Sequence, residues 1–445
     1  MSKKIKVPLI VLILTAVVFA TGCLRISADD LYSLPEVSEE YLRLQAHINI
    51  ILSQGAEYAA PARGPNRQAI QLMDINGTGS NEVIAFFSVP GESTLRIYIF
   101  ELLGDDYVMA DIIEGIGTDI DIVRFIDMDG DGVLELVIGW QMGSTLKYMS
   151  IYSLAGFQNR LLVSGEEYTE ITTLGAQSGG EDIIVLRLPT QEAGGPVAKA
   201  ISLMPDGEIV TQEARLSAGI ESISRILTGR LSDNVPAVFV ESEGRFLGGS
   251  LVTDVLTRIG SDFANVSLHS SSGVSDETVR HRMYSAEVNN DGIIKIPELR
   301  RLIAQSETEY FAIDWYTYNS SGDRNLAITT YHNSFDEWYL ILPPEWRGKV
   351  SVRREDSVPG ERTIVFSYFD AFEGYYEDFL KILRLSGDNL EQRANLAGRV
   401  MLTLHGTSAY AFELLAEQDS FGLPFNETLI RDNFRLMHTE WQLGN

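Results

Sequence analysis

The sequence is poor in the side chains on which several large classes of protein depend. Its 445 residues include one cysteine, six histidines and five tryptophans, and 62 acidic residues stand against 35 lysines and arginines, for a net charge of −27. One cysteine excludes a framework of disulfides. Because nucleic acids and anionic lipids bind to basic surfaces, the shortage of positive charge indicates that the chain has no nucleic-acid partner.

Catalytic motifs are also missing. The histidines show no metal-ligand spacing such as His-Glu-x-x-His, and the chain has no Gly-x-Ser-x-Gly elbow and no phosphate-binding loop. These absences favour a protein that is not an enzyme. They leave open a pair of carboxylates that hydrolyses glycosidic bonds, since acidic residues are numerous and the distances between them cannot be seen in a sequence.

The N-terminal apolar run is too short for a membrane-spanning helix, which needs about 20 residues. It covers 14 residues, 7–20, and lies between the basic stretch Lys3-Lys4-Ile5-Lys6 and the sequence Thr21-Gly22-Cys23. A basic stretch, an apolar run and small residues in this order are typical of a secretion signal. We predict that residues 1–22 form a signal peptide that is removed.

The single cysteine, Cys23, follows this run directly. The segment resembles the lipobox of bacterial lipoproteins, with Ala20 where that motif most often has leucine. The resemblance implies that Cys23 is lipidated and becomes the new N-terminus, so that the chain is anchored to the cell membrane on its extracytoplasmic face. A buried or unused thiol is the alternative. Loss of residues 1–22 removes three lysines and no acidic residue, which takes the net charge to about −30.

A tether and one helix are expected in residues 23–65. Apolar residues recur at helical spacing between Tyr41 and Leu52, and Gly55 can end the run. This pattern predicts a helix over 36–54.

A repeat is the most informative feature of the sequence. Residues 70–86 and 123–139 align without a gap, 53 residues apart, and each runs from a β-like segment through an Asp/Asn/Gly loop into a second β-like segment. Weaker copies lie at 171–186, 224–240 and 284–296. The first unit has four β-like segments, at 69–74, 82–88, 94–101 and 106–113. Four-stranded units of this length predict propeller blades, which must pack on one another to bury their faces.

With these loops between the first two strands, residues 66–300 resemble the FG-GAP/VCBS-type repeats of integrin-like β-propellers. The resemblance implies a mainly β fold with calcium-binding loops. From residue 301 the β-like runs become rich in aromatic residues. A last helix is predicted to begin near Asn426. We interpret residues 301–445 as an aromatic-rich α+β domain, with divergent propeller blades as the alternative.

The second copy of the loop is the strongest candidate for a calcium site. It places acidic side chains at positions 1, 3, 5 and 9, namely Asp127, Asp129, Asp131 and Glu135. Calcium prefers hard oxygen ligands of this kind. An EF-hand would need a carboxylate at position 12, where this loop has Ile138, so the spacing favours a propeller loop.

Two other loops are weaker candidates. The first copy keeps Asp74, Asn76 and Glu82 but has Thr78 at position 5, so we expect weak calcium binding or none, and a plain Asx turn is the alternative. The last copy resembles an EF-hand or dockerin loop followed by a helix over 297–303, with a solvated turn as the alternative. Its candidate ligands are Glu287, Asn289, Asp291 and Glu298.

The sequence thus predicts a calcium-stabilised binding or scaffold protein with an envelope protein or glycan as partner. Aromatic residues gather between 310 and 376, and rings such as Trp338 and Trp346 would stack on sugars if they were exposed, although strand cores hold such rings more often. The alternative function is a hydrolase or lyase that acts on envelope polysaccharide through carboxylates. A funnel lined by close carboxylates would favour that alternative.

Overall fold

The computed structural model describes residues 39–437 apart from 90, 92–94, 177–178, 189–194, 245–250, 276, 279–282 and 418–419. The predicted signal peptide and Cys23 lie outside the described residues. The chain falls into two compact units: the first extends to Gly117, and the second begins at Thr118 and includes the short segments Pro61–Arg67 and Ile75–Gly77. Within the described part of the chain, no helix has the length and apolar character needed to cross a membrane.

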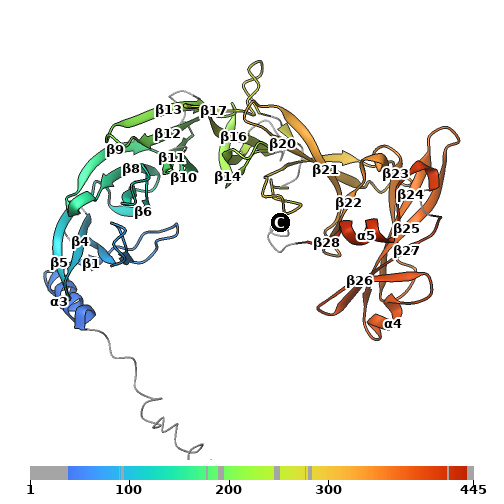
Figure 1. Cartoon of the computed structure of the whole chain (residues 1–445), viewed down its shortest axis with the longest axis horizontal. Coiled ribbons are helices and arrows are strands. Elements are labelled where there is room, and N and C mark those ends of the chain that lie inside the picture. Colours follow the sequence, from blue (N-terminus) through green and yellow to red (C-terminus); the bar gives the residue numbers. More distant parts are fainter. Residues whose placement is uncertain are drawn as a thin grey trace, which may run out of the picture. The chain divides into compact units, whose positions relative to one another are not determined.

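The first unit consists of one helix and one antiparallel sheet (Figure 1). Helix α3 (Glu39–Ser53) packs Leu44, Ile48 and Ile51 on the sheet, because residues three and four positions apart share one face of a helix. Gly55 follows it with a φ of 94°, in the left-handed region. The strands are β1 (Glu57–Tyr58), β2 (Ile70–Met73), β3 (Glu82–Ser88), β4 (Leu95–Leu103) and β5 (Asp106–Glu114).

The second unit contains five antiparallel sheets that follow one another along the chain. The first sheet consists of β6 (Asp119–Ile126), β7 (Glu135–Met142), β8 (Leu146–Ser153) and β9 (Arg160–Glu167). The second consists of β10 (Glu170–Gly175), β11 (Glu181–Arg187), β12 (Val197–Leu203) and β13 (Ile209–Arg215). The third consists of β14 (Ile220–Arg230), β15 (Pro236–Gly244), β16 (Leu251–Ile259) and β17 (Asp262–Asn265), with β18 (Glu277–Thr278) paired to β16.

The last two sheets lie in residues 296–436. One is β19 (Ile296–Arg301), β20 (Phe311–Tyr318), β21 (Arg324–Asn333) and β22 (Trp338–Leu342), with β28 (Phe434–Leu436) at its edge; the other is β23 (Val350–Glu355), β24 (Glu361–Asp370), β25 (Tyr375–Ser386), β27 (Ser408–Leu414) and β26 (Arg399–His405). Two short helices accompany them, α4 (Leu390–Ala394) and α5 (Glu427–Asn433). The side chain of Asn426 accepts a hydrogen bond from Leu429 N and caps α5, so the predicted helix start is confirmed.

Successive sheets of the second unit bury their faces against each other in shared apolar clusters. Val137 and Ile151 of one sheet pack with Ile183 of the next, and Leu186 packs in the same way with Val238 of the sheet after it. The largest such cluster joins the last two sheets. A strand exposes alternate residues on opposite faces, so a sheet covered on both sides needs runs of consecutive apolar residues, such as Leu136-Val137-Ile138 in β7 and Ile183-Ile184-Val185-Leu186 in β11.

The fold is therefore mainly β and built of propeller-like, four-stranded repeats, as predicted. All four strands expected in the first repeat are present, within two residues of the predicted bounds. First strands begin at residues 70, 119, 170, 220, 296 and 350, so most repeats are about 50 residues long and one is longer.

The predicted boundary at residue 300 is wrong. Strand β19 (Ile296–Arg301) spans that position and is the first strand of a sheet that continues with β20, so a boundary there would divide one sheet. Both later sheets have five strands and begin with consecutive antiparallel strands, β19-β20-β21-β22 and β23-β24-β25, which fits the alternative of divergent blades. The sequence after residue 301 is rich in aromatic residues because these side chains fill the apolar cluster between the last two sheets.

Candidate functional site

The loop between β6 and β7 brings three carboxylates together. Asp127, Asp129 and Asp131 each offer an oxygen, and these oxygens all lie within 4.8 Å of one another. Asp127 accepts hydrogen bonds from Gly130 N at 2.7 Å and from Gly132 N at 3.0 Å, which wraps the loop around it. Both glycines have φ above 80°, a conformation that other residues rarely adopt. The predicted spacing therefore produces the predicted convergence of the three aspartates.

Glu135 lies behind this cluster at the start of β7. Its side chain is buried, and its Oε2 accepts a hydrogen bond from Met128 N at 3.1 Å. Burial, together with the nearby aspartates, raises the pKa of Glu135 to about 7. Burial and the neighbouring Asp131 also raise the pKa of Asp129. These shifts mean that negative charge is crowded here, and a divalent cation would relieve the crowding.

Neighbouring backbone holds the loop from two sides. Glu181 N, at the start of β11, donates to Asp127 O at 3.0 Å, and Leu134 N donates to Ile75 O at 2.8 Å. A Cβ atom on Gly180 would lie 2.3 Å from Met128 O, so only glycine fits against the loop at that position. The three aspartates are thus held by a backbone that is fixed independently of any ion.

The first copy of the loop wraps its backbone around its first aspartate, as the second copy does. Asp74 accepts hydrogen bonds from Thr78 N at 3.0 Å and Gly79 N at 2.8 Å. Glu82 is buried at the start of β3, and Asn76 belongs to a segment of the second unit. Among the described residues, only the aspartates of the second loop form a group of three acidic, histidine or cysteine side chains close enough to hold a metal.

The last candidate loop has an internal cation. Lys295 Nζ lies 2.7 and 2.8 Å from the two carboxylate oxygens of Asp291, and Lys295 is 1% exposed. Glu287 Oε1 accepts hydrogen bonds from Asn289 N and Asp291 N, both at 3.0 Å. The carboxylate that the calcium pattern would use is therefore already paired with an ammonium group.

The helix predicted after this loop is wrong. Residues 296–301 form strand β19, where Glu298 pairs with Arg324 at 2.5 Å instead of turning into the loop. The run Glu-Leu-Arg-Arg-Leu has high helix propensity, but pairing with β20 overrides it. The EF-hand resemblance at 287–298 fails for this reason.

The two tryptophans proposed for sugar stacking are core residues. Trp338 is 1% exposed and Trp346 is 2% exposed, and both pack between the last two sheets. Trp346 Nε1 donates to Pro424 O at 2.9 Å, so its one polar atom is also used inside the protein. Stacking through these two rings is excluded, and the alternative that they belong to the strand core is confirmed.

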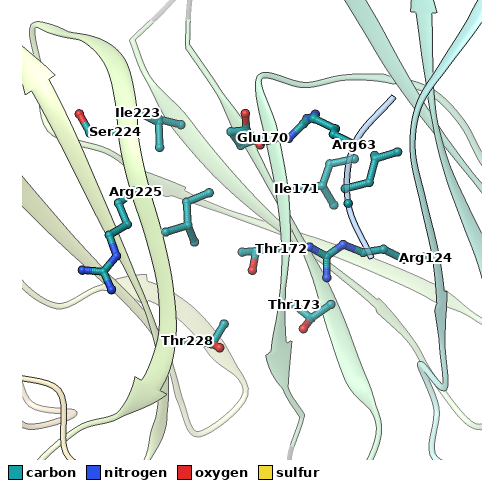
Figure 2. A pocket seen from close by; sticks show the side chains of 13 residues that line it. Arg63, Arg124, Glu170, Ile171, Thr172, Thr173, Ile223, Ser224, Arg225 and Thr228 are labelled. Atoms are coloured by element: carbon teal, nitrogen blue, oxygen red, sulfur yellow. Dashed lines mark hydrogen bonds and ion pairs between the residues drawn. The ribbon is translucent and has the colours of Figure 1, made fainter. Parts of the chain in front are cut away.

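A pocket that the sequence did not indicate lies among the first strands of three sheets of the second unit. It has a volume of about 500 Å³ and is lined by residues of β6, β10 and β14 together with Arg63 and Gly64 (Figure 2). The segment at Arg63 runs parallel to β6, with Arg63 N donating to Asp121 O at 2.9 Å. Gly64 has a φ of 90°, and a Cβ there would lie 2.7 Å from Ile122 Cγ1. This close approach brings Arg63 to the edge of the pocket.

Charge in the pocket is opposite in sign to that of the whole chain. Three arginines line it, Arg63, Arg124 and Arg225, against one carboxylate, Glu170. Arg63 Nη1 lies 2.5 Å from Glu170 Oε2, and Arg63 Nη2 lies 2.7 Å from Asp121 Oδ2. The single carboxylate of the lining is therefore neutralised by an ion pair.

Asp121 anchors this side of the pocket. Lys147 lies 2.9 Å from it, and Tyr168 donates its hydroxyl hydrogen to it at 2.7 Å. Burial alone would raise the pKa of Asp121, but the hydrogen bonds from these side chains and from Arg63 lower it below its usual range. Asp121 is thus a charged structural group that fixes Arg63.

Sequence reasoning missed every residue of this pocket. Its walls come from segments about 50 residues apart, and no motif marks them. The available signal was positional: Arg124, Thr172 and Arg225 each lie in the first strand of a repeat, at places where the predicted blades would meet.

Comparisons with known proteins add little. No protein-family model matches the chain. No curated protein matches it. Similar solved structures include a protein from Lactobacillus plantarum (9% identity, 72% of this chain and 86% of that chain, TM-score 0.27), one from Bacteroides fragilis proposed to be a 6-phosphogluconolactonase (9%, 73% and 92%, 0.25) and TolB from Acinetobacter baumannii (12%, 66% and 62%, 0.24). Values this low assign no function, and the fold rests on the sheets themselves.

Proposed function

We propose that the chain is a lipid-anchored, extracytoplasmic binding or scaffold protein, with a calcium-stabilised loop at 127–135 and an envelope protein or glycan as its partner. The lining of the pocket carries this proposal. Glycoside hydrolysis uses two carboxyl groups on either side of the scissile bond, whereas this pocket offers only Glu170, which is paired with Arg63. A pocket of this size with fixed polar groups suits binding.

Binding and turnover can be separated with the purified full-length protein and isolated envelope polysaccharide. We expect the polysaccharide to pull the protein down in a sedimentation assay without any release of reducing ends. The matched variant is Glu170→Gln, which removes the only carboxylate of the pocket while keeping its size. Cleavage of the polysaccharide by the wild type, lost in Glu170→Gln, would overturn the proposal in favour of the hydrolase or lyase.

The anchor is tested independently. Mass spectrometry of protein extracted from membranes should find diacylglycerol on Cys23, and Cys23→Ser should release the protein from the membrane fraction. Two chains are needed for stable attachment, so the diacyl form is the one expected to resist a salt wash. An unmodified thiol in the mature protein, or cleavage at another position, would refute the lipoprotein assignment.

A further inference from the structure

We propose that the pocket among β6, β10 and β14 binds the oxyanion group, a carboxylate or a phosphate, of a small hydroxylated molecule, and that Arg124 is the side chain that holds it. The inference rests on the binding function proposed above and names the chemistry of the ligand. It follows from a difference among the three arginines of the pocket: Arg63 and Arg225 have hydrogen-bond partners within the protein, whereas Arg124 has none among the described residues.

Arg124 feels the charges of Glu181 and Glu170 but has no direct hydrogen-bond partner among the described residues. Its Nε is buried and has no hydrogen bond, and among the described residues no hydrogen bond or ion pair of its guanidinium is found. Burial lowers the pKa of Arg124, which shows that its charge is poorly solvated, although an arginine stays protonated at neutral pH. Buried polar groups in proteins nearly always have partners, and an anion in the pocket would supply one to this nitrogen.

The other two arginines are already engaged. Arg63 is held by Asp121 and Glu170, as described above, and so has a structural role. Arg225 Nη1 donates to Ser285 O at 3.3 Å, and its guanidinium lies 5.5 Å from the ring centre of Tyr284. Figure 2 shows the guanidinium of Arg124 pointing toward Thr172 and Thr173, on the side of the pocket away from Arg225.

The remaining lining defines the rest of the ligand. Four hydroxyl side chains and four isoleucines line the pocket, and none of its lining residues is aromatic: Thr172, Thr173, Ser224, Thr228, Ile122, Ile171, Ile223 and Ile226. Hydroxyls donate and accept hydrogen bonds, while isoleucine offers aliphatic contact. Without a ring for stacking, this lining fits a small polyhydroxylated anion better than a planar one. Arg124 presents a planar fork of donors, which matches the two oxygens of a carboxylate or phosphate.

Binding is tested by calorimetry on the purified full-length protein with two matched pairs of probes. Glucuronate and glucose differ by a carboxylate, and glycerol 3-phosphate and glycerol differ by a phosphate. We expect one anion of these pairs to bind saturably and its neutral counterpart not to bind. The pair that responds identifies the anionic group. Arg124→Gln should weaken binding about tenfold or more, since a charge-assisted hydrogen-bond pair is lost.

The control is Arg301→Gln, because Arg301 is an exposed arginine of β19 paired with Glu309, outside the pocket. It should leave binding unchanged. If Arg124→Gln does not fold, Arg124→Lys keeps the charge but loses the fork and should still weaken binding several-fold. No binding of either anion at about 10 mM, or equal binding by folded Arg124 variants, would overturn the inference. Polysaccharide binding without cleavage would then leave the proposed function standing, whereas cleavage that depends on Glu170 would overturn that function instead.

Discussion

Two loops of this protein share a sequence pattern, but only one of them contains a cation of its own. The loop at 127–135 and the loop at 287–295 both begin with an acidic residue, carry acidic or amide side chains at positions 3 and 5, and have glycine at position 6. They differ at position 9, which is Glu135 in one and Lys295 in the other. The first loop has three converging carboxylates and a buried glutamic acid, whereas the second has Lys295 bonded to both oxygens of Asp291.

The ninth residue supplies a positive charge in the second loop and a carboxyl group in the first. Position 9 starts the following strand in the first loop and lies in a buried position in both, so its side chain is directed under the loop. A lysine there supplies the cation from within the chain. A glutamate there adds a carboxyl group to the three aspartates and supplies no cation. Substitution of Lys295 and titration of Glu135 test this role of position 9.

Lys295→Glu should have the largest effect. It removes the buried partner of Asp291 and adds a buried carboxylate, so in EDTA we expect unfolding in urea to require about 3–5 kcal/mol less. Calcium should restore part of the lost free energy of unfolding, because the variant loop has a glutamate at position 9, as the loop at 127–135 does. Lys295→Met is the control: it loses the ion pair but gains no ligand, and calcium should not rescue it. Equal calcium responses of the two variants would refute the role of position 9.

Calcium should stabilise the wild type through the loop at 127–135. At a free calcium concentration a hundredfold above the dissociation constant, a ligand that binds only the folded state adds about 2.7 kcal/mol. Joint replacement of Asp127 and Asp129 by alanine should remove most of this increment. Glu287→Gln, in the loop with the internal lysine, should leave it intact. Thermal unfolding with and without calcium measures the effect, and an unchanged melting temperature of the wild type would mean that the loop is only a turn.

The stability of the calcium-free protein should fall as the pH rises through the neutral range. The pKa of Glu135 is about 7 in the folded protein, above its ordinary value of 4.5, so the folded state keeps a proton that the unfolded state has lost. The contribution of Glu135 is therefore complete below pH 4.5 and is lost as the pH rises through 7; its size is on the order of 3 kcal/mol.

Glu135→Gln should remove this dependence and make the calcium-free protein more stable at pH 8. Calcium binding should become weaker below pH 7 in the wild type, since the proton and the ion compete for the same carboxylate. Urea unfolding at pH 5, 6, 7 and 8 in EDTA provides the comparison. A wild type that is most stable at pH 8 without calcium would contradict the assigned state of Glu135.

Local patterns predicted much of this structure, and long-range contacts account for what they missed. The strands of the first repeat and the cap at Asn426 depend on neighbouring residues, so the sequence indicated them. The pair Arg63 and Asp121 is separated by 58 residues, and its contact is made by the packing of one segment along β6. Lys295 stands at position 9 of its loop, and an EF-hand pattern, which requires a carboxylate at position 12, does not include it.

Thr78→Asp should have the smallest effect, and it extends the comparison to the first loop. That loop has Glu82 at position 9, like the second, but lacks the acidic side chain at position 5 that Asp131 provides there. Thr78 is exposed, and its backbone N donates to Asp74, a bond that a change of side chain leaves in place. In EDTA the added charge should repel Asp74 and cost about 0.5 kcal/mol. With calcium the sign should reverse, because the loop gains a ligand, whereas Thr78→Asn should be indifferent to calcium.

The measurement is urea unfolding of a background that carries Asp127→Ala and Asp129→Ala, so that any calcium response comes from the first loop alone. If calcium then stabilises Thr78→Asp no more than Thr78→Asn, a ninth-position glutamate is not sufficient to make this turn a calcium site, and the difference between the first two loops lies in their backbone.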